Sequence, residues 1–319
     1  MAKKDVTFVT AVYDDLQDTE LAGRHNRGTQ YAFSLAQMHS MGVPIFCYTD
    51  KTNMYKFFPC LYGHGVEHFN FINYNLKDYP LYHRIQEVKS KKSEMYRDMT
   101  AWKNRCVEIM WGKFDWIIHT AEQIGLEGDK YLYWIDAGLS HSGVLPKKYN
   151  SQFIEDKESA TMSKRYNNSF YYDRIFNPDF PDYLANYTGS GKLFYLMCTS
   201  PQHSDPSHLQ LKKLVLVGTA VGGLFGGNVR MLYDLANEAK ELCTELLDNE
   251  FLIKEEDILS YLINQHLNDD PSYEDTFNMF RFDTWYHEDW LADWSDKLYD
   301  PSRQNTFGDF FEDFVNREK

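Results

Sequence analysis

The sequence predicts an α/β fold with a mostly parallel central sheet, and three observations support that prediction. Residues 5–13 (DVTFVTAVY) and 43–50 (VPIFCYTD) are short apolar runs, rich in β-branched and aromatic residues, as buried strands are. A helical segment at about 27–41 lies between them, and a strand, a helix and a buried strand in that order open a parallel sheet. A further apolar run at 129–140 (DKYLYWIDAGLS) extends the pattern as a third buried strand.

The remaining elements follow in chain order. Apolar residues recur at helical spacing between about 93 and 111, and a second helix is expected at about 114–124. Residues 213–227 (KLVLVGTAVGGLFGG) have the pattern of a strand, a glycine turn and another strand. Asn228 is a suitable N-cap for a following helix, and residues 255–267 form another short helix with acids at its start.

The size and composition fit one domain that spans residues 1–319. The 319 residues are 43% hydrophobic and 25% charged, which is ordinary for a globular protein and excludes collagen-like or disulfide-stapled chains. Aromatic residues make up 16%, which is enough for a large core and for the lining of a ligand cleft.

Acidic residues outnumber basic ones, mainly near the C-terminus. The net charge is −14, and the excess of Asp and Glu lies in residues 241–319. Such a tail would repel a phosphate backbone, so the overall charge disfavours DNA as a partner. Residues 77–113 are locally basic and form the best candidate for a nucleic-acid contact, although a solvated helix face also accounts for most of these charges.

Cysteine usage and hydropathy predict a cytoplasmic protein with no membrane span. The chain has five cysteines, no CxxC pair and no zinc-ligand spacing, which is typical of reduced intracellular thiols. The first apolar run is too short for a signal peptide. The longest uncharged stretch lies between Lys213 and Arg230, is shorter than a membrane span and is rich in glycine.

Asp136, in the motif WIDAG at 134–138, is the first candidate for a functional residue. It ends a buried strand, and such residues face the crevice where α/β folds bind ligands. A carboxylate is a suitable ligand for Mg²⁺ or Mn²⁺, either of which can bridge a substrate diphosphate. The alternative is an Asp that caps a turn.

Three further groups follow in the chain. The pairs Gly222-Gly223 and Gly226-Gly227 give special dihedrals or room for a substrate, or else a tight hairpin. The acids of Glu255-Glu256-Asp257 begin a helix, where they complement the helix dipole or supply a general base. His287 lies near acids and is a candidate metal ligand, and His266 is a weaker rival.

In this order, the four groups resemble the shared core of the glycosyltransferase A-type (GT-A) fold. That core has a strand-end Asp motif, a glycine loop, an x-Glu-Asp motif on a helix and a late His. The segments FVTAVYD, WIDAG and GGLFGGN, together with the helix that contains Lys103, are also similar to the bacterial HtrL/YibB family of glycosyltransferase-like proteins. The resemblance covers most of the chain except 53–90 and 141–210, and it implies a Rossmann-like α/β/α sandwich.

The resemblance implies a glycosyltransferase that moves a sugar from a nucleotide-diphosphate sugar to an acceptor hydroxyl. Residues 1–140 would be the nucleotide-sugar-binding half, and 141–319 the acceptor half with its acidic tail. The implied donor-binding residues are Thr10, Ala11, Tyr13, Lys103, Trp134 and Asp136.

The same resemblance implies a metal and a catalytic base. Asp136 and His287 would hold Mn²⁺ or Mg²⁺ on the diphosphate, and Glu256 or Asp257 would deprotonate the acceptor. The acceptor side would be shaped by Gly222, Gly223, Gly226 and Gly227. One departure matters: the usual motif is Asp-x-Asp, and Trp134 occupies its first position. Lys103 would then neutralise part of the leaving charge.

Several alternatives remain open at this stage. The acceptor is a glycan by default, and the runner-up is a hydroxymethylated base in DNA, as in phage DNA-modifying enzymes. A nucleotidyltransferase would need a phosphate-binding loop after the first strand, where Gly23, Arg24, Arg27 and Gly28 form no clear motif. A sugar-nucleotide-binding protein without catalysis is the non-enzymatic alternative, and the single Asp of the metal motif is its main support.

Overall fold

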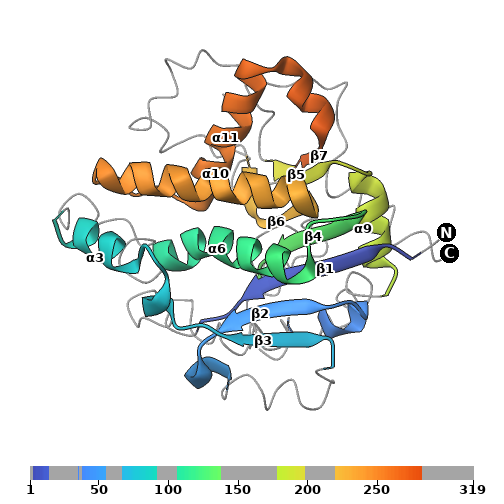
Figure 1. Cartoon of the computed structure of the whole chain (residues 1–319), viewed down its shortest axis with the longest axis horizontal. Helices are drawn as coiled ribbons and strands as arrows, with labels where there is room; N and C mark the ends of the chain where they lie inside the picture. Colours follow the sequence, from blue (N-terminus) through green and yellow to red (C-terminus); the bar gives the residue numbers. More distant parts are fainter. Residues whose placement is uncertain are drawn as a thin grey trace, which may run out of the picture.

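Seven strands form one sheet in the order β3-β2-β1-β4-β6-β5-β7, with helices packed against it (Figure 1). The structure, a computed structural model, describes residues 3–13, 35, 38–54, 67–91, 106–137, 178–197 and 220–281. The strands are β1 (Asp5–Ala11), β2 (Ile45–Thr49), β3 (Phe69–Asn73), β4 (Lys130–Ile135), β5 (Leu193–Met197), β6 (Ala220–Asn228) and β7 (Phe277–Arg281). The α-helices are α3 (Tyr82–Lys91), α6 (Cys106–Ile124), α9 (Phe180–Thr188), α10 (Val229–Asp248) and α11 (Glu255–Asp269), and the short 3-10 helices are η2 (His39–Met41), η3 (Leu76–Asp78) and η9 (Pro271–Thr276).

The sheet is mostly parallel, and this confirms the predicted α/β class. β1 pairs in parallel with β2 and β4, β2 pairs in parallel with β3, and β5 pairs in parallel with β7. β6 is antiparallel to both of its neighbours, β4 and β5. Strands from before residue 140 and from after it therefore belong to one sheet.

Helices cover both faces of the sheet. Successive side chains of a strand point to opposite faces, so the apolar side chains of a buried strand need cover on both. Leu132 and Trp134 of β4 join the main core beneath α6 and α10. Tyr133 points to the other face, where its hydroxyl lies 2.8 Å from Thr188 Oγ1 of α9. None of the helices in the described ranges combines the length and the apolar character that a bilayer crossing requires.

The glycine pairs lie inside β6, so the predicted turn between two strands is wrong at this point. Gly226 and Gly227 adopt φ angles of 147° and 141°. A Cβ atom on Gly226 would lie 2.3 Å from Leu132 O, and one on Gly227 would lie 2.4 Å from Lys192 O. These two glycines let β6 pass close to the backbones on either side of it.

Helix α6 is one continuous helix across the point where the sequence pattern predicts a break. Gly112 lies mid-helix, and a Cβ atom there would come within 2.9 Å of the Trp116 ring. The glycine thus makes room for the ring, which stacks on Trp134 of the sheet with centroids 6.0 Å apart. This packing fixes the face of α6 that carries Lys113 against the sheet, and Lys113 is buried.

The sheet order creates a switch point between β1 and β4. The chain leaves β1 to form β2 on one side, and it later returns to form β4 on the other side. Ligands of open α/β sheets bind outside the carboxyl ends of the strands at such a point. Because β6 runs antiparallel to β4, the residues that begin β6 lie at the same end of the sheet, beside the residue after Ile135.

Candidate functional site

Four charged side chains meet at the carboxyl end of β4. Lys113 comes from α6, Asp136 follows β4, and Glu255 and Glu256 begin α11. We call these four residues the strand-end cluster. Gly222, near the start of β6, binds two of them through its backbone. The cluster lies at the switch point of the sheet, where an α/β fold binds its ligand.

Asp136 is held in place by two donors and keeps part of its carboxylate exposed. Its backbone N–H donates to Gly223 O (2.8 Å), and its Oδ1 accepts from Trp134 Nε1 (2.7 Å) and lies 3.0 Å from Lys113 Nζ. The side chain is 33% exposed, and Oδ2 has no hydrogen-bond partner within the described part of the chain. Burial raises the pKa of Asp136, Lys113 opposes that shift, and the nearby Glu255 adds to it.

Lys113 is the buried cation of the cluster. Its Nζ donates to Glu255 Oε1 (2.6 Å) and Gly222 O (3.0 Å), and it lies 5.1 Å from the centre of the Trp134 ring. Burial alone would lower the pKa of Lys113, but Asp136 and Glu255 together raise it above its ordinary value. The ammonium therefore stays charged over the whole physiological pH range.

Glu255 reaches Lys113 because Gly222 has no side chain. A Cβ atom on Gly222 would lie 2.5 Å from Glu255 Oε1, so an alanine at this position would displace the carboxylate. The second oxygen, Oε2, is buried and has no hydrogen-bond partner within the described ranges. A buried carboxylate oxygen without a donor is costly, and a bound ligand or ion would satisfy it.

Glu256 and Asp257 differ in what they contact. Glu256 Oε1 accepts from Gly222 N (3.3 Å), and burial together with Glu255 raises its pKa to about 7. Asp257 Oδ2 instead accepts from Lys254 N (3.3 Å) and caps α11, and burial raises its pKa to about 6. A group with a pKa near neutral pH can both accept and release a proton, which favours Glu256 over Asp257 as a base.

The carboxyl end of β1 lies next to the strand-end cluster, and its residues differ in exposure. Thr10 is fully buried, and its Oγ1 has no hydrogen-bond partner in the described part of the structure. Ala11 is partly exposed. Tyr13 is a core residue, because it stacks on Trp116 (5.7 Å between centroids) and donates its hydroxyl to Tyr74 O (2.8 Å).

Trp134 also belongs to the core rather than to an open surface. The resemblance places Trp134 against the donor, whereas the structure leaves its side chain only 1% exposed and directs Nε1 at Asp136. Trp134 orients Asp136 through this Nε1 hydrogen bond. Lys103 and His287 lie outside the described residues.

The four predicted glycines fall at two different places along β6. Gly222 and Gly223 bind the strand-end cluster and Asp136 through their backbones. Gly226 and Gly227 lie beside Tyr133 and Leu132 of β4, further from the end of the sheet, and serve strand packing. Of these four glycines, only the first pair lies at the edge of the sheet that holds the cluster.

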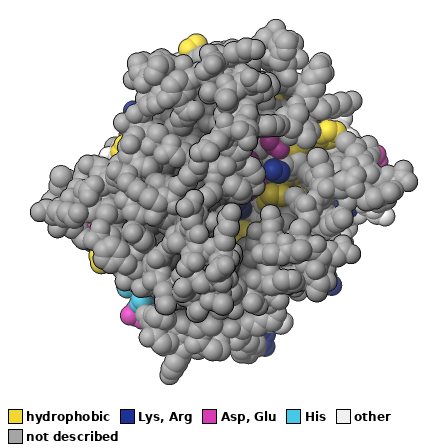
Figure 2. Space-filling model, turned by 180° about the vertical axis from the view of Figure 1, so that it is seen from behind, with side chains coloured by type: hydrophobic (Ala, Val, Ile, Leu, Met, Phe, Trp, Pro, Cys, Tyr) yellow, Lys and Arg dark blue, Asp and Glu magenta, His cyan; other side chains and the backbone are white. Residues whose placement is uncertain are grey.

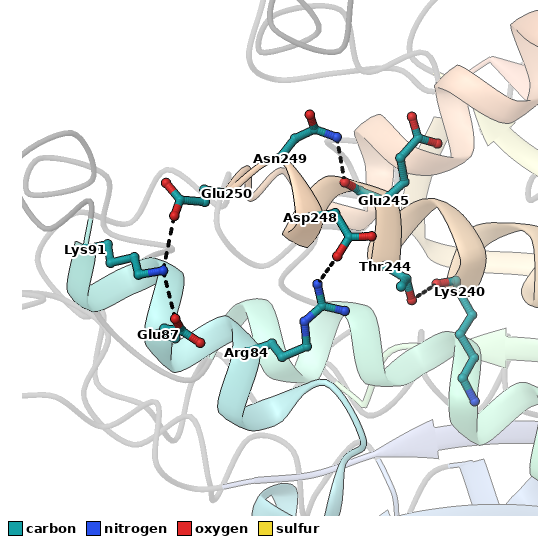
Figure 3. A network of polar contacts seen from close by, with 9 residues as sticks. All are labelled: Arg84, Glu87, Lys91, Lys240, Thr244, Glu245, Asp248, Asn249 and Glu250. Atoms are coloured by element: carbon teal, nitrogen blue, oxygen red, sulfur yellow. Dashed lines mark hydrogen bonds and ion pairs between the residues drawn. The ribbon is translucent and has the colours of Figure 1, made fainter.

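The basic stretch at 77–113 is largely neutralised by carboxylates in its described part. Arg84 pairs with Asp248, and Lys91 pairs with Glu87 (2.8 Å) and Glu250 (3.1 Å), as Figure 3 shows. Two further lysines of this stretch, Lys89 and Lys113, pair with Glu108 and Glu255. Paired charges attract a phosphate backbone weakly, so this surface gives little support to a DNA acceptor.

Lys113 is the member of the cluster to which the sequence motifs do not point. A lysine in a helix usually faces solvent, so Lys113 gives no local signal of burial. One signal was present in the sequence: Lys113 is flanked by the apolar run IMWG on one side and by Phe114, Trp116 and Ile117 on the other. Glu255 belongs to the acidic triplet that the sequence singles out, but the resemblance implies a catalytic role for Glu256 or Asp257 instead.

Comparison with known proteins adds no family assignment. No protein-family model matches the chain, and a search of curated proteins finds no significant match. The geometry of the strand-end cluster therefore carries the functional argument.

Proposed function

We propose that the protein is a glycosyltransferase that moves a sugar from a nucleotide-diphosphate sugar to an acceptor hydroxyl. One observation supports this most directly: Asp136, Glu255 and Glu256 converge with Lys113 at the switch point of the sheet. A donor whose diphosphate lies at this crevice would meet both a buried cation and carboxylates. The GT-A form of the fold, suggested by sequence resemblance, belongs to the same proposal.

Lys113 supplies part of the charge that the departing diphosphate needs. In sugar transfer, the bond between the anomeric carbon and the diphosphate oxygen breaks, and negative charge develops on that oxygen. A preorganised cation stabilises this charge, and removal of such a group typically costs about 3–4 kcal/mol of barrier. Lys113 thus takes the role that the resemblance gives to Lys103.

A divalent ion fits the described carboxylates. Asp136 Oδ2 and Glu255 Oε2 are hard oxygen donors without protein partners in the described ranges, which is the ligand type that Mg²⁺ and Mn²⁺ prefer. When bound, the ion would neutralise charge on the diphosphate. Asp136 would hold it, and Lys113 would keep the two carboxylates close together.

Glu256 is the best-placed base for the acceptor. Its pKa of about 7 lets the carboxylate take the proton of the acceptor hydroxyl while that oxygen forms its bond to the anomeric carbon. A base positioned in this way typically contributes about 10²–10⁴-fold. Attack from the face opposite the departing diphosphate would invert the anomeric centre.

The decisive experiment is a donor panel. Purified full-length protein is incubated with UDP- and GDP-sugars and Mn²⁺, and release of the nucleoside diphosphate is measured. We expect release from at least one donor, and loss of that release in Asp136→Ala, while Arg84→Ala serves as a surface control. Binding of a donor without release would identify a non-catalytic sugar-nucleotide-binding protein. The absence of both binding and release would reject the proposal.

A further inference from the structure

A second group of metal-binding side chains lies where β2 and β3 begin, at the opposite end of these strands from the edge that holds the strand-end cluster. His39 begins η2, and Gly42, with a φ of 66°, turns the chain toward β2. Glu67 and His68 immediately precede β3. Because β2 and β3 are parallel neighbours, the segments that lead into them lie side by side, and Ile45 N donates to His68 O (2.8 Å).

The three side chains are close enough to share one ion. One ligand atom from each of His39, Glu67 and His68 lies within 4.8 Å of the other two. His39 Nε2 lies 3.4 Å from Glu67 Oε1, and the two imidazole rings have centroids 4.9 Å apart. Ligand atoms around tetrahedral Zn²⁺ are about 3.3 Å apart when its bonds are about 2.0–2.1 Å. Small side-chain rotations would therefore bring the three ligand atoms to the spacing that Zn²⁺ requires.

The His39 imidazole is largely buried and is held in place by its neighbours. The His39 side chain is only 13% exposed, and its Nδ1 is buried with no hydrogen-bond partner among the described residues. The ring is therefore held by packing, including contact with the Phe69 ring, while its hydrogen-bonding capacity is not exhausted by the protein. Figure 2 shows histidine and acidic side-chain atoms next to each other at the edge of the molecule.

We propose that His39, Glu67 and His68 bind a divalent transition-metal ion, with Zn²⁺ as the best match. Two imidazoles and one carboxylate form a donor set suited to Zn²⁺, whereas Mg²⁺ and Ca²⁺ prefer oxygen ligands. Three protein ligands leave a fourth tetrahedral position for water or another ligand. The bound ion would connect the entry segments of β2 and β3, so it would stabilise this side of the sheet.

The pair His266–Glu238 provides an internal comparison. His266 Nε2 lies 2.6 Å from Glu238 Oε2, and this contact raises the pKa of His266. The pair supplies one imidazole and one carboxylate, and the His266 ring stacks on Tyr273. A lone histidine–carboxylate pair binds Zn²⁺ weakly, so His266→Ala is a matched control for the three-residue site.

The test is a metal titration of the full-length protein after treatment with a chelator. Zn²⁺ is titrated in competition with a chromophoric chelator, and Co²⁺ absorption in the visible range reports the coordination. We expect one Zn²⁺ to bind at this site with a micromolar or lower dissociation constant, and weakening of at least about tenfold in His39→Ala and in His68→Ala. Zn²⁺ should also raise the melting temperature of the wild type but not of these variants.

Two further variants keep the result unambiguous. Glu67 is 69% exposed, so Glu67→Gln should fold normally and still weaken Zn²⁺ binding, as far-UV circular dichroism and titration together would show. Asp136→Ala should bind Zn²⁺ like the wild type, because it removes a residue of the other site only. Wild-type affinity in His39→Ala and Glu67→Gln, or loss of binding in Asp136→Ala or His266→Ala, would overturn the proposal, as would the absence of binding to the wild type.

Discussion

Helix α6 carries two buried charged side chains, and their surroundings differ. Glu108 is fully buried, and Lys89 Nζ donates to both of its oxygens (2.8 and 2.7 Å), while Gln86 also donates to one of them. Lys113 is equally buried, but one oxygen of Glu255 and one of Asp136 have no partner in the described ranges. The first ion pair is closed and holds α3 against α6, whereas the second leaves capacity for a ligand.

The two groups differ in unused hydrogen-bonding capacity, and our proposal assigns a ligand only to the group that has it. Both groups are buried, so burial alone does not identify a site. Position supports the same division, because Lys113 lies at the carboxyl end of β4 whereas Glu108 faces α3. Four experiments test this division, in order of decreasing expected effect.

The largest effect is expected on turnover. Asp136→Ala should reduce sugar transfer by at least about 10²-fold, because the carboxylate at the strand end no longer faces the diphosphate. Glu108→Gln should leave turnover within a few-fold of wild type, although it weakens the ion pair with Lys89. Equal losses in steady-state assays of the two folded variants would contradict the division.

The next effect is on stability and on its rescue by metal. Lys113→Met and Lys89→Met each leave buried carboxylate charge without a cation, which typically costs about 3–5 kcal/mol of unfolding free energy. We expect Mn²⁺ to restore part of the stability of Lys113→Met, because Asp136 and Glu255 then face each other with open oxygens. Chemical denaturation with and without Mn²⁺ measures this, and an equal rescue of Lys89→Met would show that the cluster has no special affinity for cations.

A smaller effect is expected in the pH dependence of stability. The pKa of Glu256 is about 7 in the folded state and is ordinarily 4.5, so the folded state holds the proton more tightly. This contribution is fully present below about pH 4.5 and is lost as the pH rises to about 7. Glu256→Gln removes the charge, so it should gain about 1–3 kcal/mol relative to wild type between pH 4.5 and 8. A constant difference between the two denaturation profiles would refute the shifted pKa.

The smallest effect is expected for the surface ion pairs of α3 and α10. Arg84 and Asp248 are 39% and 66% exposed, so water screens their attraction. A double-mutant cycle of Arg84→Ala and Asp248→Ala should give a coupling of about 0–1 kcal/mol that decreases with salt. A coupling of about 3–5 kcal/mol, which is the size of the loss when a buried pair is broken, would mean that exposure does not distinguish these groups.

Three parallel strands, β1, β2 and β4, were predictable, whereas β3 and the course of β6 were not. Runs such as FVTAV and YLYWI have few alternatives to a buried strand, and their order implies the crossovers that parallel pairing needs. The glycine pairs resemble a turn because glycine is common in turns. Only the position of β6 between the backbones of β4 and β5 explains the pairs, and that position is a tertiary property.

The candidate site was predictable in part for a related reason. Asp136 and the acids of α11 stand at element ends, where a sequence pattern gives their direction. The contacts of Lys113 with Asp136 and Glu255 depend on how α6 packs on the sheet, which no local pattern contains. His39 and His68 likewise meet only because β2 and β3 pair, so their spacing in sequence matches no common zinc motif.

The place of β6 also affects how the chain folds during synthesis. β4 ends at Ile135, and its neighbour β6 begins at Ala220, so the ribosome adds a long segment before that edge of β4 can pair. At about 5–20 residues per second, the delay is roughly 4 to 17 seconds. During that interval the nascent chain presents the unpaired edge of an aromatic strand, which is a template for association with other chains. Chaperone supply and translation rate should therefore govern how much of this protein is recovered when it is overexpressed.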